Sequence, residues 1–293
     1  MPQIPDTSVA DSPRPFLLWV GETRDAELHL ARSGLSGLVA VAEAATPAAA
    51  VAMGMPGQQS PAITLLAAAV PGGWTLADAV LLSRHWPLTP VVSVATSLID
   101  GRRRSGPALP GVEEVPWTDL PGRVAWWLHD MAAGRPGTLG MPATSRREER
   151  IMESAVRVRE WSSPQRPRPR ISVAAARAGE VECLVDLLSA AGAPVTRRTC
   201  GRPPLDEPAD VLVWDVSALT PSHLAWLQIL TANQPALRVV LLDSFPRGDS
   251  TTAALRAGAV AVLARPVSLE ALAGTLIRLE TAAFALGGEQ GRG

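Results

Sequence analysis

Few residues of this chain have the type and spacing that catalysis or metal binding requires. Lysine is absent and all 27 basic residues are arginines, which excludes any lysine-dependent mechanism. The two cysteines, Cys183 and Cys200, are too few for a disulfide framework or a structural zinc site, and we expect reduced thiols buried in the core. The sequence also lacks a glycine-rich phosphate loop, a nucleophile elbow and an HExxH motif. These absences predict a protein that is not an enzyme.

Other polar residues of interest stand where short apolar segments end. Asp215 ends the segment 210–215 (DVLVWD), Ser244 follows 238–242 (RVVLL) closely, and Arg265 follows 260–264. Short continuous apolar runs are typical of strands that are buried on both faces of a parallel sheet. Ligands of such sheets bind in the crevice at the carboxyl ends of the strands. One hypothesis is therefore a small-molecule sensor that uses this crevice.

Apolar segments alternate with helical segments along both halves of the 293-residue chain. In the first half we expect strands at 16–20, 38–42, 62–67, 90–95 and 112–115, and helices at 26–32, from 46, at 74–86 and at 119–131. In the second half we expect strands at 170–175, 194–199, 210–215, 238–242 and 260–264, and helices at 180–191, 221–232, 249–257 and 268–285. This alternation predicts parallel sheets covered on both faces. The predicted fold class is α/β, with two tandem flavodoxin-like, doubly wound, parallel five-stranded sheets.

The order and spacing of the segments repeat, which indicates an internal duplication. The segment 115–118 (VPWT) is echoed by 265–268 (RPVS): in both, a proline follows a strand and Thr or Ser caps the last helix. We expect the following organisation: a disordered N-terminus at 1–14, domains at 15–134 and 170–285, a linker at 135–169, and a flexible tail at 286–293.

The linker contains an expected helix at 145–161, which Ser145 and Glu148 begin as a capping box. Ile151, Ala155 and Val158 lie on one face of this helix, and arginines and glutamates fill most of the rest. The apolar stripe has two interpretations. It packs against the protein's own domains, or it joins two copies as a dimerising helix.

The second half resembles the receiver domains of response regulators, the CheY-like family. The resemblance is most specific over 238–279, where the segment 255–259 (LRAGA) precedes a strand, Arg265-Pro266 and a final helix. It implies that Asp215 is the candidate phosphoacceptor, that Ser244 stands for the switch hydroxyl, and that Arg265 occupies the position of the family's lysine. Arginine keeps the charge but is a wider, planar donor, so this exchange is not conservative.

The family also needs an acidic pair after the first strand to hold Mg²⁺, which neutralises the incoming phosphoryl group. The segment 174–177 (AAAR) stands there instead, so we expect poor Mg²⁺ binding and name Arg177 as a candidate partner of Asp215. No cofactor is expected, and Mg²⁺ only if Asp215 is a live acceptor. The first half keeps less: a single acid at Glu22, no carboxylate after Leu66-Ala67-Ala68, Thr96 as a hydroxyl match, and Val115 at the lysine position. We expect that half to take no phosphate.

The sequence also makes predictions about partners and about location. The net charge is −1, so neither nucleic acid nor a membrane is an expected partner. Candidate interaction residues are the loop arginines Arg102, Arg103 and Arg104, and Trp126 and Trp127, which point about 100° apart on a helix and so leave one free as an anchor. The sequence lacks a signal peptide and a long apolar run, which favours a cytoplasmic location.

The first functional hypothesis is a tandem pseudo-receiver that serves as a non-enzymatic interaction or dimerisation module. It would bind a protein partner or a second copy through the fourth helix, fifth strand and fifth helix, the usual partner surface of the family. The alternative is a phosphorylation-dependent response regulator that uses Asp215, with a histidine kinase or another signalling protein as the partner. The missing acidic pair favours the first hypothesis.

Overall fold

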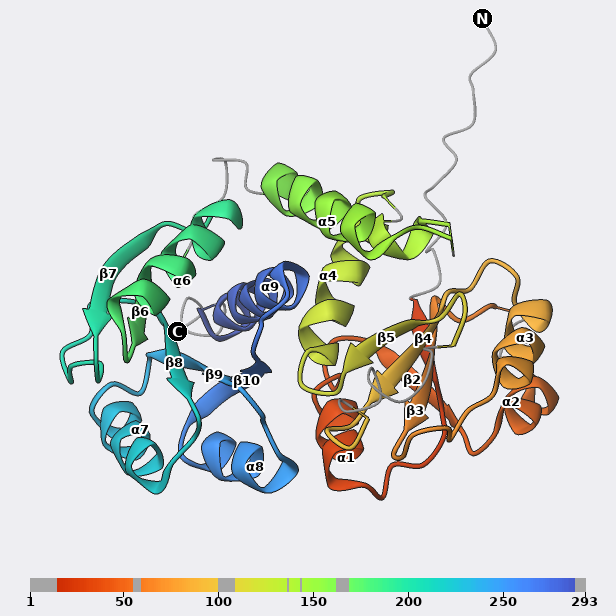
Figure 1. Ribbon diagram of the computed structural model, residues 1–293, viewed down its shortest axis with the longest axis horizontal. Helices are drawn as coiled ribbons and strands as arrows, with labels where there is room; N and C mark the ends of the chain where they lie inside the picture. Colours follow the sequence, from red (N-terminus) through yellow and green to blue (C-terminus); the bar gives the residue numbers. More distant parts are fainter. Residues whose placement is uncertain are drawn as a thin grey trace, which may run out of the picture.

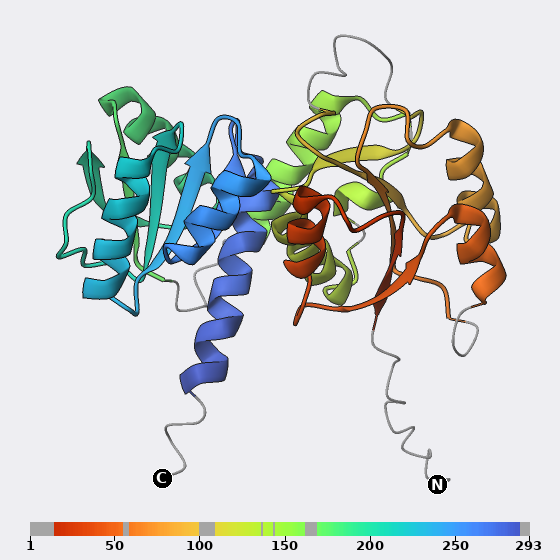
Figure 2. The same ribbon diagram turned by 90° about the horizontal axis from the view of Figure 1, so that it is seen from below.

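The computed structural model describes residues 15–287, except 55–58, 100–108, 136, 143 and 162–168. Arg102, Arg103 and Arg104, which were candidate interaction residues, lie outside the described residues. The elements form two α/β units that lie side by side, with a connecting helix across them (Figures 1 and 2). None of the helices among the described residues has the length and apolar character needed to cross a bilayer.

The first unit contains β1 (Phe16–Val20), α1 (Ala26–Ser33), β2 (Ala40–Ala44), α2 (Pro47–Met53), β3 (Ile63–Ala68), α3 (Leu76–His85), β4 (Val91–Ala95), β5 (Glu113–Pro116) and α4 (Leu120–Ala132). The connection contains the 3-10 helix η3 (Gly137–Gly140) and α5 (Arg147–Trp161). The second unit contains β6 (Ile171–Ala175), α6 (Ala178–Ala190), β7 (Val195–Cys200), β8 (Val211–Ser217), α7 (Pro221–Asn233), β9 (Arg238–Asp243), α8 (Gly248–Arg256), β10 (Ala259–Ala264) and α9 (Leu269–Gly287).

Both sheets are parallel and have the same strand order. The orders are β2-β1-β3-β4-β5 and β7-β6-β8-β9-β10, so each unit places its strands in the order second, first, third, fourth, fifth. This is the doubly wound order of flavodoxin and CheY. The predicted fold class is therefore confirmed: the chain consists of two tandem receiver-like units.

Side chains at the helix starts explain several boundaries. Thr75 and Asp78 form a reciprocal capping box at α3, and Asp25 accepts two backbone N–H groups at α1. Helix α5 begins at Arg147, two residues after the predicted start. The backbone N–H of Arg146 donates to the Glu149 carboxylate at 2.7 Å, so the acidic cap acts one residue later than the sequence pattern suggested.

Each sheet is covered on both faces by helices with apolar inner sides. In the first unit, α1 and α4 cover one face and α2 and α3 the other. In the second unit, α6 and α9 cover one face and α7 and α8 the other. The core beneath α4 continues into the second unit, because Val158 of α5 and Ala273 of α9 belong to it.

This shared core corrects the interpretation of Trp126 and Trp127. Both indole side chains are buried, at 1% exposure each. Helix α4 packs on its own sheet and also against α9, so residues 100° apart on it are both covered. Neither tryptophan is free to anchor a partner.

The two cysteines also differ from expectation, since Cys183 and Cys200 are both exposed. On α6 the buried side is taken by Val181, Leu184 and Val185, which turns Cys183 outward. Cys200 ends β7, an edge strand whose burial alternates along its length.

Helices α4 and α9 approach so closely that only glycine fits at the contact. A Cβ atom added to Gly274 would lie 1.9 Å from the carbonyl oxygen of Gly122. A Cβ atom added to Gly122 would lie 2.3 Å from the carbonyl oxygen of Ala271. Because glycine has no Cβ, the two backbones can touch, and this contact fixes how the two units meet.

Candidate functional site

The second unit gathers charged groups at the carboxyl ends of its strands. The strand registers align the end of β8 with the ends of β6 and β9, and the end of β9 with that of β10. Asp215 of β8 therefore lies near Asp243 of β9 and Arg265, which follows β10. Asp215 and Asp243 are both buried, at 4% and 5% exposure. The sequence did place a carboxylate and a cation at this edge.

Arg265 is the cation that holds Asp215. Its guanidinium donates to the Asp215 Oδ1 at 3.1 Å and to the Ser217 hydroxyl at 2.8 Å. The same guanidinium lies 3.6 Å from the carboxylate of Glu180, in the first turn of α6. Arg177 is exposed at the N-cap of α6, so the predicted pairing of Arg177 with Asp215 is wrong. Asp215 pairs with Arg265 instead.

The ionisation of Asp215 reflects opposing effects. Burial raises the pKa of Asp215 above its ordinary value, and this effect outweighs the N–H of Ser217 and the charge of Arg265, which lower it. Glu180 and Asp243 raise the pKa further by like-charge repulsion. The Arg265 guanidinium thus contacts two carboxyl groups, Asp215 and Glu180, while Asp243 lies nearby without a contact to it.

The other predicted switch position is Ser244. Its side chain is exposed, and its hydroxyl makes no hydrogen bond with any residue that the structure describes, while its backbone N–H donates to the Ser217 carbonyl at 2.8 Å. No group of three or more His, Cys, Asp or Glu side chains with metal-binding geometry occurs among the described residues.

The corresponding edge of the first unit holds no carboxylate at the end of β3, where Ala68 is buried. The Thr96 hydroxyl donates to the Ala69 carbonyl at 2.9 Å, so it is already engaged. Glu22 is mostly exposed and lies 3.7 Å from Arg24. That this unit takes no phosphate stays a prediction, and its residues supply no nucleophile at the acceptor position.

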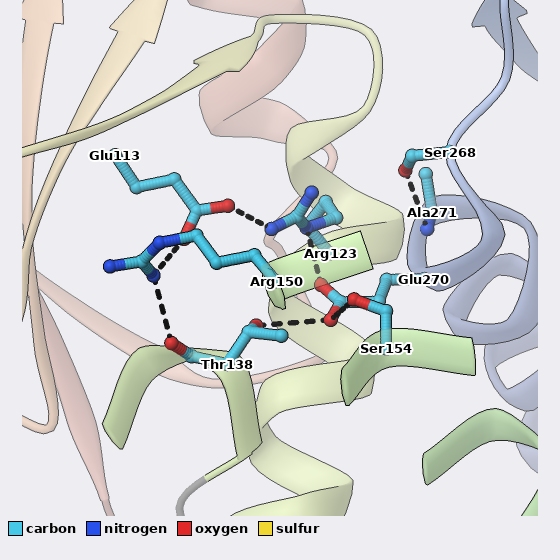
Figure 3. Close-up of polar contacts among 8 residues, drawn as sticks. All are labelled: Glu113, Arg123, Thr138, Arg150, Ser154, Ser268, Glu270 and Ala271. Atoms are coloured by element: carbon cyan, nitrogen blue, oxygen red, sulfur yellow. Dashed lines mark hydrogen bonds and ion pairs between the residues drawn. The ribbon is translucent and has the colours of Figure 1, made fainter. Parts of the chain in front are cut away.

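A second polar site joins the two units, and the sequence did not reveal it. Figure 3 shows this interface cluster, which consists of Glu113, Arg123, Thr138, Arg150, Ser154 and Glu270. Glu270 of α9 is 1% exposed, and its Oε2 lies 2.8 Å from the Nε of Arg123 on α4. Its other oxygen accepts from the hydroxyls of Thr138 at 3.0 Å and of Ser154. A carboxylate of the second unit thus binds three elements that precede that unit.

Arg123 carries the matching charge at the centre of this cluster. It pairs with Glu270 and with Glu113 of β5, and its planar face lies 4.9 Å from the centre of the Trp127 ring. Burial alone would lower the pKa of Arg123, but Glu270 and Glu113 raise it, so the guanidinium stays charged. Arg150 of α5 lies 3.7 Å from Glu113 and donates to the Thr138 carbonyl at 3.0 Å.

A third contact between the units lies at the start of α8. Glu27 of α1 is buried and accepts from the Ser97 N–H at 2.6 Å, the Ser97 hydroxyl at 2.7 Å and the Gly248 N–H at 3.2 Å. Arg247 donates to the Ser97 hydroxyl at 2.9 Å. A carboxylate at a helix N-terminus is stabilised by the unpaired N–H groups and the helix dipole.

These contacts change the expectation about the partner surface. In the second unit no helix lies between β7 and β8, so the family's fourth helix, fifth strand and fifth helix correspond to α8, β10 and α9. Helix α9 packs on α4, and α8 contacts α1. This face of the second unit is therefore occupied within the chain. The signal in the sequence was faint, because Glu270 and Arg123 are two of the few charges in largely apolar helices and nothing within either helix indicates a partner in the other.

Comparisons with known proteins find likeness in solved structures alone. No protein-family model matches the chain, and no curated protein matches it. A pilus assembly protein (cpaE) from Burkholderia thailandensis E264 is 31% identical, with a TM-score of 0.36 over 38% of this chain and 98% of that one. A CheY-like protein (tadZ) from Pseudomonas aeruginosa PAO1 is 27% identical, with a TM-score of 0.31 over 38% and 98% of the two chains. The receiver domain of the Francisella response regulator 1452 is 20% identical, with a TM-score of 0.34 over 39% and 98%.

Proposed function

We propose that this protein is a non-enzymatic signalling protein, in which two pseudo-receivers form one fixed pair that serves as an interaction module. The observation that supports this most directly is the state of Asp215. Its carboxylate is buried and bound by Arg265, and 174–177 (AAAR) stands where receivers hold Mg²⁺. Without a metal, the phosphoryl oxygens would meet three carboxyl groups and one cation that is already engaged.

Phosphorylation of Asp215 is the second candidate, and one observation favours it. Asp215 lies at the strand end with Arg265 and Ser217 within hydrogen-bond distance, so a phosphoryl group there would find donors. A small-molecule sensor is less well supported. A cavity lined by Thr96, Trp117 and Phe245, between the strand ends of the two units, has a volume of about 30 Å³, which is space for a few water molecules.

Beryllofluoride with Mg²⁺ distinguishes the first two candidates, because it mimics an aspartyl phosphate. We expect that adding both leaves the melting temperature of the full wild-type chain unchanged, and that it also leaves the melting temperature of the Asp215→Ala variant unchanged. A rise of several degrees in the wild type that is absent from Asp215→Ala would overturn the proposal, since binding to the native state alone stabilises it. Phosphorylation-dependent signalling would then take its place.

A further inference from the structure

Helix α5 has one side that is fully used within the chain. It lies across the two units and contacts α9, η3 and α6 (Figure 1). On this inner side, Ser154 binds Glu270, Arg150 donates to the Thr138 and Pro142 carbonyls, and Val158 is completely buried. Of the predicted apolar stripe of Ile151, Ala155 and Val158, only Val158 is buried, so the stripe does not pack against the two units along its whole length.

Beside this inner side, α5 carries an uncovered apolar stripe. Ile151, Met152 and Val156 are 57%, 69% and 50% exposed, and Ala155 is exposed beside them. At 100° per residue, Ile151, Ala155, Met152 and Val156 follow one another around the helix over an arc of about 140°. Met152 lies about 160° from Ser154, whereas Ile151 borders the buried Val158. Single exposed apolar residues are ordinary, whereas four neighbours on one helix mark an interaction surface.

Charged residues of opposite sign lie at the two ends of this surface. Glu148 and Arg159 are both exposed, and neither has an ion-pair partner among the residues that the structure describes. Glu148, Met152, Ala155 and Arg159 are spaced by four, three and four residues, which is the spacing of a coiled-coil seam. We name these four residues, together with Ile151 and Val156, the outer face of α5.

We propose that two copies of this chain associate through the outer face of α5, with the two helices antiparallel. In that orientation Met152 of each copy packs on Ala155 of the other, a large side chain against a small one. Glu148 of each copy meets Arg159 of the other at both ends of the seam. Ile151 and Val156 flank the seam on its two sides.

The charges of Glu148 and Arg159 favour a second copy of the chain as the partner and an antiparallel orientation of the two helices. A parallel pair would place Glu148 beside Glu148 and Arg159 beside Arg159, and like charges at such positions repel. The antiparallel pair satisfies every position of the outer face with the same face of a second copy. Such self-complementarity is the property of an isologous two-fold interface.

The contact is small, so the dimer is weak. Helix α5 has 15 residues, which corresponds to about 22 Å of length, and one helix pair of this size buries less than a standard interface. We expect dissociation constants from roughly 1 to 100 µM. The proposal concerns the interaction role of the protein but is independent of the state of Asp215, so its failure and a positive beryllofluoride result are separate outcomes.

Sedimentation velocity of the full chain tests the surface. From roughly 1 to 300 µM the wild type should shift from monomer to dimer, and Met152→Glu should remain monomeric with an unchanged melting temperature. The matched control is Leu88→Glu, since Leu88 is 95% exposed away from α5, and this variant should dimerise like the wild type. A wild type that is monomeric throughout, or a dimer that Met152→Glu leaves intact, would overturn the proposal.

Exchanging the end charges tests the orientation. Glu148→Arg alone and Arg159→Glu alone should each weaken the dimer at least tenfold, because each places like charges at both ends. The double variant Glu148→Arg/Arg159→Glu should regain the wild-type affinity, and an equimolar mixture of the two single variants should form a mixed dimer. If both single variants dimerise as the wild type does, the antiparallel register is wrong.

Discussion

Among single residues, Asp215 is the one on which the proposed non-enzymatic role rests most directly. The carboxyl group lies where a nucleophile would be needed, yet burial and two neighbouring carboxylates disfavour its charge. Arg265 compensates only part of this, since it also binds Ser217 and lies near Glu180. Arg265, the cation that contacts Asp215, is already engaged by its hydrogen bonds to Asp215 and Ser217.

The raised pKa of Asp215 predicts a pH dependence of stability. A carboxyl group whose pKa is higher in the folded state binds its proton more tightly there, so it stabilises the fold at acid pH and this contribution is lost as pH rises through the folded pKa. Asp215→Asn removes the charge, so the variant should be at least as stable as the wild type at pH 7 to 8. Its advantage should shrink as the pH falls through the raised pKa that Asp215 has in the folded state.

Urea unfolding of both proteins across this pH range measures the difference. Asp186→Asn is the matched control, because Asp186 is exposed on α6 and surface substitutions of this kind change stability by about 0.5 kcal/mol or less. An Asp215→Asn variant that is clearly less stable than the wild type at pH 8 would show that the Arg265 ion pair outweighs burial.

At the scale of secondary structure, the sequence was most informative where one physical cause dominates. Strands that are buried on both faces form continuous apolar runs, so the segment 210–215 (DVLVWD) was recognised as a strand and corresponds to β8 (Val211–Ser217). Helices that are covered on two sides were not recognised as such from the sequence. Both Trp126 and Trp127 are buried because α4 packs on its sheet and on α9, and the second contact depends on residues about 150 positions away, which periodicity within a single helix does not report.

The close contact between α4 and α9 predicts how a substitution of Gly274 changes the stability of the protein. In most helix interiors Gly→Ala is favourable by roughly 0.5–1 kcal/mol, but here the new Cβ would lie 1.9 Å from the Gly122 carbonyl. Gly274→Ala should therefore destabilise the protein by roughly 1–3 kcal/mol, as overpacking does. Gly179→Ala on α6 is the matched control, because no atom lies within 4 Å of its added Cβ, and it should stabilise. Equal effects of the two variants in urea unfolding would refute the close contact.

For the whole molecule, the two units are joined by different faces. The first unit contributes α1 and α4, and the second contributes α8 and α9, so the pair within the chain is not symmetric. The consequence is that the second unit's usual partner face is used internally, and the exposed outer face of α5 becomes the surface through which the pair can meet another copy. The fold of each unit was predictable from its own sequence, whereas this arrangement depends on isolated charges such as Glu27 and Glu270 whose partners lie in the other unit.

The last prediction concerns Glu270, which binds the second unit to three elements that precede it in the chain. Glu270→Gln keeps the shape and can still accept from Thr138 and Ser154. It leaves the buried Arg123 with the counter-charges of Glu113 and Asp119 alone among the described residues. Removing one partner of a buried ion pair costs roughly 3–5 kcal/mol, and we expect the lower end because Glu113 remains. The loss should concern the interface first, so urea unfolding of Glu270→Gln should separate into two transitions where the wild type shows one.

Two control variants distinguish the cost of breaking a buried ion pair from the cost of breaking an exposed one. Glu182→Gln breaks the exposed pair with Arg198 and should cost at most about 1 kcal/mol. The double variant Arg123→Met/Glu270→Met should recover much of the lost stability, since apolar side chains of similar size often replace a buried pair without loss. If Glu270→Gln costs no more than Glu182→Gln, the two units are held by their apolar contact, and the interface cluster fixes only how they are oriented.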